Sequence, residues 1–289
     1  MAIAAVVAAP AASAYPVSVK RGVTYGQGEV KLPARGKAPL MMDLYRPEGA
    51  GSRLPVVVIV HGGGFVTGTR SDQNIARAAT ALASRGIVTA SIDYRLKKQA
   101  PVPSRRFARL AAAMKGARLG PAYPDPDSVA AAAQDALTAV GYLRKNATRL
   151  GIRSTRLGLM GSSAGAVTVD NLAYVAPSYG IDVPKIRFVA SLWGGLIVPA
   201  PGGGPALTNL RRSGAPLFLV HGTADKTVPV ALSDAMRARA VEKRVPVEYH
   251  RLAGRGHGWP GSGIFTERTP GGETVFDRMV AYAARRLAP

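Results

Sequence analysis

The chain contains no cysteine and only four histidines in 289 residues. Without cysteine there can be no disulfide, no thiolate nucleophile and no cysteine-bound metal or cluster. A metal site built from histidine would need nearly every imidazole in the chain, and the H-E-x-x-H spacing is missing. We therefore expect neither a metal nor another cofactor.

No stretch reaches the roughly 18 apolar residues that a membrane-spanning helix needs, so no membrane span is expected. Residues 1–14 form a shorter apolar stretch ending in Ala12-Ser13-Ala14, the small-residue pattern at which export signals are cleaved. No positive charge precedes this stretch. We interpret residues 1–14 as a signal peptide or, alternatively, a disordered leader. A signal peptide predicts a secreted or periplasmic protein, and a leader that is not a signal predicts a cytoplasmic one.

Acidic residues are scarce, because 17 of them stand against 38 lysines and arginines and leave a formal charge of +21. Between Asp93 and Asp125 the chain carries eight basic residues and no acid. Such an excess attracts anionic polymers, membrane surfaces or acidic substrates at low salt, although it serves solubility equally well. No zinc-finger spacing or aromatic RNA-binding motif accompanies the charge, so no specific nucleic-acid partner is expected.

Short apolar runs rich in β-branched residues alternate with stretches of helical period, which predicts a mostly parallel sheet with helices on both faces. Buried strands are expected over 54–60, 86–92, 156–160, 186–192, 216–220 and 246–251. Two earlier runs, 28–32 and 40–45, alternate apolar and polar residues and predict an antiparallel edge. Helices are expected over 72–84, 127–146, 163–176, 230–243 and 273–287, the second capped by Asp127 or Ser128. Residues 15–289 should form a single domain.

Residues 96–126 interrupt this alternation. They combine a basic amphipathic helix, with Phe107, Leu110 and Met114 on one side, and a proline-rich stretch. We interpret the segment as a small lid-like insertion over the carboxyl-terminal edge of the sheet, or as a surface loop with no role in substrate access.

The clearest chemical motif is the G-x-S-x-G pattern over residues 161–165, between a predicted strand and a predicted helix. A sharp turn there projects the central hydroxyl above the sheet, and the glycines leave room for neighbouring backbone. The pattern also arises by chance in chains rich in glycine and serine, so its strand-to-helix position is what counts. Ser163 is therefore the predicted nucleophile.

A second motif, His61-Gly62-Gly63-Gly64-Phe65, directly follows the strand 54–60. Glycine backbone can turn its N–H groups inward, and donors fixed in this way stabilise the oxyanion that forms during acyl transfer. Gly63, Gly64 and Ala164 are expected to supply these amides. A phosphate cradle is the alternative, but neither the G-K-[ST] nor the G-x-G-x-x-G spacing is present.

A serine nucleophile needs a base, and His257 is the candidate because it stands in a glycine-bounded loop after the last predicted strand. His250 lies within that strand and is interpreted as structural. His61 and His221 each follow a strand and precede a glycine, so we expect them to hold loops by hydrogen bonding.

The base in turn needs a carboxylate to orient it. Asp225 fits because it follows the strand 216–220, whereas Asp182 and Asp234 compete on chain order alone. The resulting order of serine, aspartate and histidine is found in one large group of serine hydrolases.

Together these residues resemble the α/β-hydrolase superfamily over roughly residues 40–287, particularly bacterial carboxylesterases of the hormone-sensitive-lipase-like and the acetyl or feruloyl esterase-like groups. Asp93-Tyr94-Arg95-Leu96 is similar to a D-Y-R-L segment of the first group, where it supports the oxyanion loop. The segment 61–65 followed by Gly68 also resembles type-B carboxylesterases, but those chains are much longer and usually carry glutamate in place of Asp225. Lys97-Lys98-Gln99, Ser162 and Ala166 depart from the first group, which leaves the subfamily and the acyl preference open.

The resemblance implies a serine carboxylesterase that forms an acyl-enzyme on Ser163 and needs no cofactor. A serine peptidase of the same fold is one alternative, and a noncatalytic polyanion-binding protein is another. Phe65, Trp193 and Trp259 are candidates for an apolar acyl pocket and equally for the core. The basic charge and the expected export favour an acylated polysaccharide or a polyester as substrate.

Overall fold

The computed structural model describes residues 14–117 and 123–289. The leader expected over residues 1–14 therefore lies outside the described residues, except for Ala14, and so do residues 118–122 of the predicted insertion. Within the described ranges, no helix is both long enough and apolar enough to cross a membrane.

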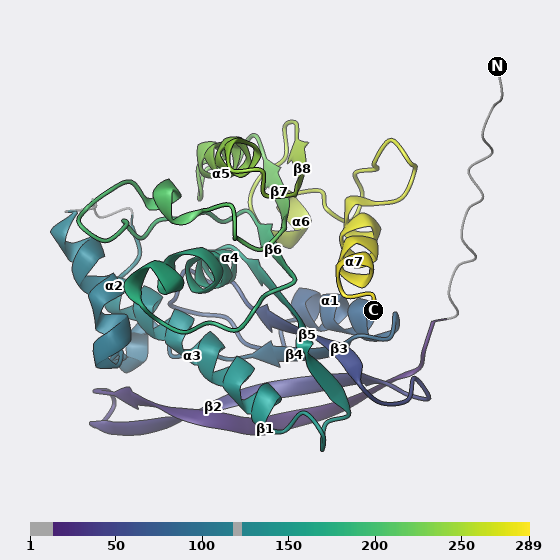
Figure 1. The fold of residues 1–289 in the computed structure, drawn as a ribbon, viewed down its shortest axis with the longest axis horizontal. Coiled ribbons are helices and arrows are strands. Elements are labelled where there is room, and N and C mark those ends of the chain that lie inside the picture. Colours follow the sequence, from purple (N-terminus) through teal and green to yellow (C-terminus); the bar gives the residue numbers. More distant parts are fainter. Residues whose placement is uncertain (1–13, 118–122) are drawn as a thin grey trace.

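Eight strands form one sheet. They are β1 (Val17–Val30), β2 (Gly36–Pro47), β3 (Leu54–Val60), β4 (Val88–Ile92), β5 (Ile152–Ser162), β6 (Phe188–Leu192), β7 (Leu217–Gly222) and β8 (Val247–Leu252). Their order is β1-β2-β4-β3-β5-β6-β7-β8, as Figure 1 shows. The pairs β1–β2 and β2–β4 are antiparallel and all the others are parallel. The predicted parallel sheet with an antiparallel edge is therefore confirmed.

The first strand is much longer than the sequence predicts. It begins at Val17 rather than near residue 28, and most of its first half is exposed. An edge strand of this kind buries few side chains, so it carries little of the apolar alternation by which strands are found.

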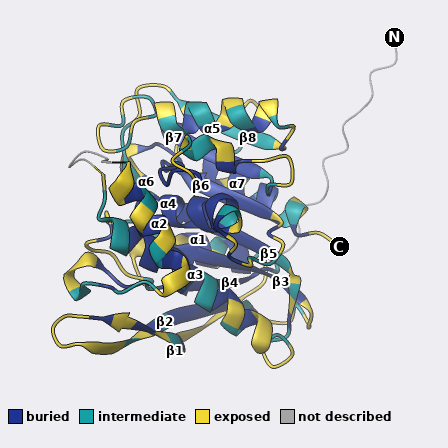
Figure 2. Ribbon diagram, turned by 60° about the vertical axis from the view of Figure 1, so that its left-hand side comes forward, coloured by how far each residue is buried: buried dark blue, intermediate teal, exposed yellow. Residues whose placement is uncertain are grey.

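Seven α-helices lie in the described ranges: α1 (Gln73–Ala83), α2 (Arg105–Gly116), α3 (Pro126–Lys145), α4 (Ala164–Asp170), α5 (Ala231–Glu242), α6 (Gly258–Gly261) and α7 (Val275–Arg286). The buried side chains of α2 to α5 share one core with one face of the sheet. Those of α1 and α7 share a second core with the other face. The sheet is thus a buried middle layer, dark blue in Figure 2.

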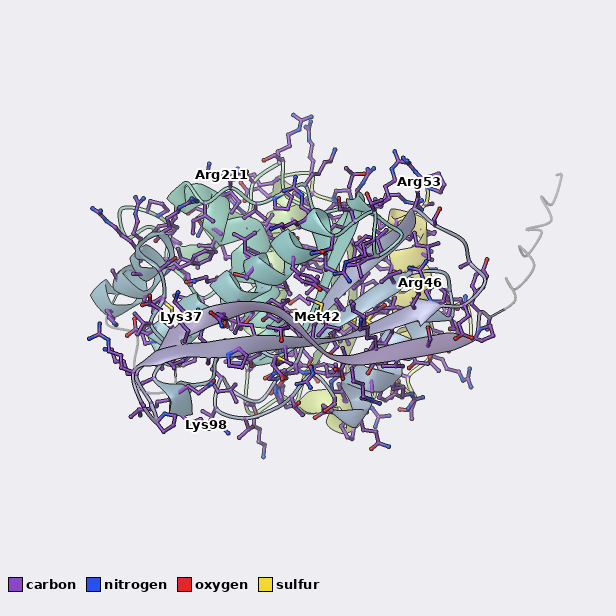
Figure 3. All side chains as sticks on the ribbon, turned by 90° about the horizontal axis from the view of Figure 1, so that it is seen from below. Lys37, Met42, Arg46, Arg53, Lys98 and Arg211 are labelled. Atoms are coloured by element: carbon purple, nitrogen blue, oxygen red, sulfur yellow. The ribbon has the colours of Figure 1, made fainter. Side chains whose placement is uncertain are left out.

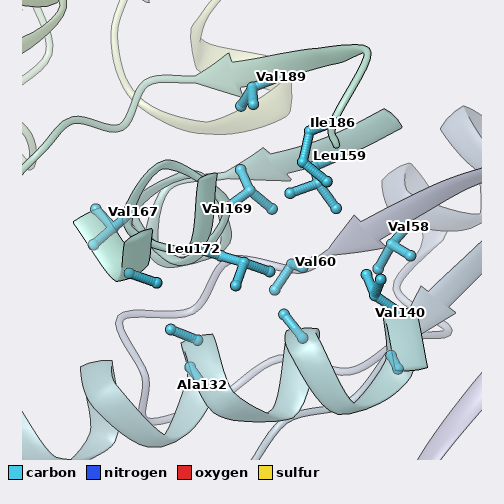
Figure 4. Close-up of a cluster of buried hydrophobic side chains, with 14 of the residues drawn as sticks. Val58, Val60, Ala132, Val140, Leu159, Val167, Val169, Leu172, Ile186 and Val189 are labelled. Atoms are coloured by element: carbon cyan, nitrogen blue, oxygen red, sulfur yellow. The ribbon is translucent and has the colours of Figure 1, made fainter. Parts of the chain in front are cut away.

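Strand β3 shows how the sequence builds both cores. Val56, Val58 and Val60 point into the first core, whereas Val57 and Ile59 point into the second. Because successive side chains of a strand alternate between faces, a strand covered on both sides reads as a continuous apolar run. Figure 4 shows the first core, where Val58 lies beside Val140 of α3 and Val60 lies beside Leu172.

Two helix predictions need correction. Helix α3 begins at Pro126 and is capped by Asp125, whose carboxylate accepts from the amide of Ser128, and not by Asp127 or Ser128. Proline suits a first helical position because its missing N–H would have no partner there. The helix expected over 163–176 is α-helical only to Asp170, then continues as a π-helix over Asn171–Val175 and a 3-10 helix over Ala176–Tyr179. Pro177 cannot donate a backbone hydrogen bond, which prevents a regular α-helix from continuing there.

The predicted insertion contains the expected amphipathic helix. In α2 the side chains of Phe107, Leu110 and Met114 are buried, and the helix packs on α3 and on the 3-10 helix over Ala176–Tyr179. Its apolar face therefore belongs to the first core. The role of this segment as a lid stays a prediction.

Candidate active site

The turn that carries Ser163 joins β5 to α4 and has an unusual backbone. Ser163 has φ 54° and ψ −121°, a conformation that a residue with a Cβ rarely adopts. The turn is fixed because the Ser163 amide donates to the carbonyl of Leu192 at 2.9 Å, and its carbonyl accepts from Val167 at 3.0 Å. The hydroxyl is thereby held at the carboxyl-terminal edge of the sheet, at the start of a helix.

The two glycines of the motif are required by close backbone contacts. A Cβ on Gly161 would lie 2.1 Å from the carbonyl oxygen of Gly165. A Cβ on Gly165 would lie 2.1 Å from the carbonyl oxygen of Val60, at the end of β3. Both distances are far below contact, so only glycine lets α4 pass this close to the strand.

The structure brings Ser163, His257 and Asp225 together. The His257 Nδ1 atom lies 2.7 Å from Asp225 Oδ2, and Nε2 lies 2.9 Å from the Ser163 hydroxyl. A carboxylate can only accept, so Nδ1 carries the proton, and Nε2 is left to accept the hydroxyl proton of Ser163. The imidazole is 22% exposed and the carboxylate is fully buried. This arrangement can remove a proton from the serine as it attacks.

Asp225 is held as a carboxylate by its surroundings. Burial alone would raise the pKa of Asp225, but hydrogen bonds from the Val228 amide, from His257 and from the Thr227 amide together lower the pKa below its usual value. The negative charge therefore persists at neutral pH, where it can orient the imidazole and stabilise its protonated form.

His221 also contacts the acid, which the sequence did not indicate. Its Nε2 lies 3.0 Å from the carbonyl of Val228 and 3.2 Å from Asp225 Oδ2, and its Nδ1 lies 2.8 Å from the hydroxyl of Ser233. Burial lowers the pKa of His221, so the ring is neutral and donates through Nε2. The spacing of four residues between His221 and Asp225 was the available signal. The other carboxylates considered lie elsewhere: Asp182 is exposed, and Asp234 binds Tyr249 and Arg251.

The glycine-rich loop after β3 lies against the nucleophile. A Cβ on Gly62 would come within 3.2 Å of the Ser163 Cβ. Gly63 and Gly64 have φ angles of 104° and 62°, which glycine adopts readily. Among the described residues, neither of their amides donates to a protein acceptor. Ala164 is the first residue of α4, and the amides of a first helical turn have no partner within the helix.

The segment 93–96 supports this loop from behind. The Tyr94 hydroxyl lies 3.3 Å from the carbonyl oxygens of both His61 and Gly62, and its ring stacks on the His61 imidazole at 4.5 Å. Asp93 accepts from the amide and the guanidinium of Arg70. The loop therefore rests on a fixed polar and aromatic base.

Arg95 anchors the same segment to the rest of the molecule. Its guanidinium and the Asp135 carboxylate form a fully buried ion pair at 2.7 Å. The Arg95 guanidinium also donates to the carbonyls of Glu29, at 2.8 Å, and Val102, at 2.9 Å. A buried charge needs this complete set of partners to be tolerated.

The three aromatic residues predicted at the site are buried. Phe65 is 2% exposed and packs edge-on against Tyr94. Trp193 and Trp259 are 1% and 7% exposed and pack against each other, with the Trp193 ring 6.3 Å from that of His257. Burial therefore favours a role in core packing over a role in an acyl pocket. Trp193 also packs beside the His257 imidazole.

Metal ligation has no support in the described ranges, where no group of three or more histidine, aspartate or glutamate side chains could hold an ion. The chemistry available is that of a serine hydroxyl, an imidazole, a carboxylate and free backbone amides.

The sheet, the helices on both its faces and the turn carrying Ser163 define the α/β-hydrolase fold, so the predicted fold class is confirmed. The family model described as BD-FAE matches residues 42–107, which include the glycine-rich loop and the segment 93–96.

Solved structures share the fold over nearly the whole chain. Esterase 2 of Thermogutta terrifontis phosphoramylated by tabun superposes with a TM-score of 0.64 at 20% identity, covering 94% of this chain and 93% of that one. A truncated carbohydrate esterase from gut microbiota superposes with a TM-score of 0.64 at 16% identity, covering 96% of this chain and 99% of that one. A fungal esterase structure from Rhizomucor miehei superposes with a TM-score of 0.62 at 18% identity, covering 95% of this chain and 85% of that one.

Among curated proteins, the non-reducing polyketide synthase ausA of Aspergillus calidoustus is 27% identical over 186 residues, or 62% of this chain. The aligned part is only 7% of that synthase. The likeness therefore concerns one portion of a much longer protein.

Proposed function

We propose that the protein is a serine carboxylesterase, which hydrolyses carboxylic esters through an acyl-enzyme on Ser163. The observation that carries the proposal is the hydrogen-bonded row of Ser163, His257 and Asp225 beside the free amides of the glycine-rich loop. The fold shared with three solved esterases supports it.

In the first half of the reaction, the Ser163 oxygen bonds to the ester carbonyl carbon while its proton moves to Nε2 of His257. The carbonyl oxygen becomes an oxyanion, and in this proposal the amides of Gly63, Gly64 and Ala164 bind it. Each such donor is worth about 10²- to 10³-fold in rate. The tetrahedral intermediate collapses as the bond to the alcohol breaks and the imidazolium returns its proton to the leaving oxygen.

In the second half, water replaces the alcohol. His257 takes a proton from the water, whose oxygen bonds to the acyl carbon. The second tetrahedral intermediate then breaks the bond to the Ser163 oxygen, which regains its proton from the imidazolium. A carboxylic acid leaves, and no cofactor takes part in either half.

The test compares Ser163→Ala with Ser162→Ala, a matched loss of one hydroxyl from the neighbouring, buried position. On a short nitrophenyl ester, we expect Ser163→Ala to lower kcat by at least about 10⁴-fold with the fold retained, and Ser162→Ala to keep activity. A fluorophosphonate probe should label the parent protein at Ser163 alone. Unchanged turnover by Ser163→Ala, or a parent protein that reacts with neither the ester nor the probe, would refute the proposal.

A further inference from the structure

Seven basic side chains gather on two segments near the glycine-rich loop, the turn between β1 and β2 and the stretch from residue 97 to the start of α2. We call them the basic patch: Lys31, Arg35, Lys37, Lys97, Lys98, Arg105 and Arg106. All seven are exposed, and residues 29–37 and 97–106 together contain one acid, Glu29.

The two segments of the basic patch lie side by side. The Lys31 amide hydrogen-bonds to the carbonyl of Ala100 at 3.1 Å, and the Val102 amide bonds to the carbonyl of Glu29 at 2.9 Å. Figure 3 shows Lys37 and Lys98 at the same end of the molecule, with Arg46 and Arg53 at the other. The seven charges therefore lie on two adjoining segments of the chain.

These charges are not neutralised by the protein. In the part of the chain that the structure describes, no carboxylate lies within 4.0 Å of any of the seven basic groups. By contrast, Arg70, which follows the glycine-rich loop, and Arg95, which precedes Lys97, are both paired with aspartates. Like charges left unpaired on one surface create a field that attracts anions at low salt.

The basic patch is joined directly to the glycine-rich loop. The amide of Lys97 donates to the carbonyl oxygen of Phe65 at 2.7 Å. On the same loop Gly63, Gly64, Val66 and Thr67 are exposed, Val66 by 48%. A long substrate can therefore reach the loop from solvent while its flanking units lie over the basic patch.

We propose that the ester is carried by an acidic polysaccharide, a polymer whose sugar units bear carboxylates beside neutral acyl groups. This inference rests on the proposed esterase function. The carboxylates would lie on the basic patch, and the uncharged ester would lie at Ser163. The positive field of the patch then raises the local concentration of substrate, while none of its side chains contacts the reacting atoms. A lipid bilayer fits less well, because only Leu32 and Val66 offer a large exposed apolar side chain from the patch and the loop.

The experiment measures kcat/KM on acetylated polygalacturonate, on acetylated glucomannan as the neutral counterpart, and on nitrophenyl acetate, each at 20 and 300 mM NaCl. We expect the acidic polymer to be the best substrate at low salt and to lose most of its advantage at high salt, where the screening length is below about 8 Å. The two uncharged substrates should respond little to salt.

The test variant is Lys37→Gln/Lys98→Gln/Arg105→Gln, and its matched control is Arg153→Gln/Lys185→Gln/Arg212→Gln, which removes three exposed charges elsewhere. The test variant should lose about tenfold in kcat/KM on the acidic polymer at low salt and keep its activity on nitrophenyl acetate. The control variant should lose less than twofold on either substrate.

Equal activity on both polymers, or equal losses in the two variants, would overturn the inference while leaving the esterase proposal intact. A parallel assay uses vesicles of anionic phospholipid. Preferential action on these vesicles, with no preference for the acidic polymer, would overturn the inference in favour of a lipid surface. Inactivity on all three esters would instead count against the proposed function.

Discussion

Asp170, the last residue of α4, offers a test of how a buried carboxyl behaves in the helix that follows the nucleophile. Its side chain is fully buried, Oδ2 accepts from the Ser191 hydroxyl at 2.7 Å, and Oδ1 has no partner among the described residues. Burial raises the pKa of Asp170 to about 7, and the Ser191 hydrogen bond only partly opposes this. The group is therefore largely protonated in the folded protein below neutral pH.

A raised pKa has a defined effect on stability. Between the unfolded pKa and about 7, the folded state holds the proton and the unfolded state does not, so stability falls as pH rises through this range. The contribution of Asp170 is fully present below about pH 4 and is lost once pH exceeds about 7. The difference of about three pKa units corresponds to about 4 kcal/mol.

Asp170→Asn removes the titration and keeps an oxygen that can accept from Ser191. Between pH 5 and pH 8.5, the free energy of unfolding of the variant should rise by about 3 kcal/mol relative to that of the parent. The parent loses about 1.4 kcal/mol for each of the two pH units between pH 5 and the pKa of Asp170, whereas the variant has no such group to titrate. The free energy of unfolding in urea at each pH measures the effect, and the groups common to both proteins cancel in the difference.

The control is Asp182→Asn, which makes the same chemical change at an exposed position and is measured at both pH values. If the difference between Asp170→Asn and the parent changed by less than about 1 kcal/mol between pH 5 and 8.5, Asp170 would already be ionised in the folded protein at pH 5. The reasoning from burial would then be wrong.

Three further substitutions test the site and its supports. Asp225→Asn should lower kcat on nitrophenyl acetate by about 10⁴-fold with the fold intact, since an amide can hold the imidazole in the wrong tautomer; a loss below tenfold would contradict the role of the acid. Gly165→Ala should destabilise the fold by about 3 kcal/mol in urea, because its methyl group would lie 2.1 Å from the carbonyl of Val60, and a neutral effect would show that α4 can move. Arg95→Met should lower the free energy of unfolding by about 3–5 kcal/mol, because it leaves the Asp135 carboxylate buried and unpaired. Adding Asp135→Leu should restore much of that stability. If the double variant were no more stable than the single one, the unpaired charge would not be the cause of the loss.

The parts of the fold that could be predicted are those in which local sequence and burial agree. Strand β3 was predicted with its observed bounds because both its faces are covered and every residue is apolar. The turn at Ser163 and the loop at Gly63 could be located because their backbone conformations require glycine at nearby positions. Each of these features is encoded within a few residues.

Features that depend on distant contacts could not be predicted in the same way. The change from α-helix to π-helix after Asp170 occurs in a segment, Asn171–Val175, that is mostly buried against other elements, so its geometry depends on that packing. The contact between His221 and Asp225 spans only four residues, but the spacing alone does not show how the loop after β7 folds back. The burial of Trp193 depends on α6 and Trp259 closing over it, which no local pattern shows.

Because acidic residues are few, their positions decide which basic side chains are paired and which remain unpaired. Asp43, Asp93 and Asp135 pair with arginines behind the glycine-rich loop, and there they hold the loop in place. So few acids remain that the basic patch in front of the loop has no carboxylate within reach. Salt should act differently on the two sets, because buried and half-buried pairs are screened far less than exposed charges. Rising salt should therefore weaken attraction of an anionic polymer at concentrations that leave the loop, and turnover of a small neutral ester, unchanged.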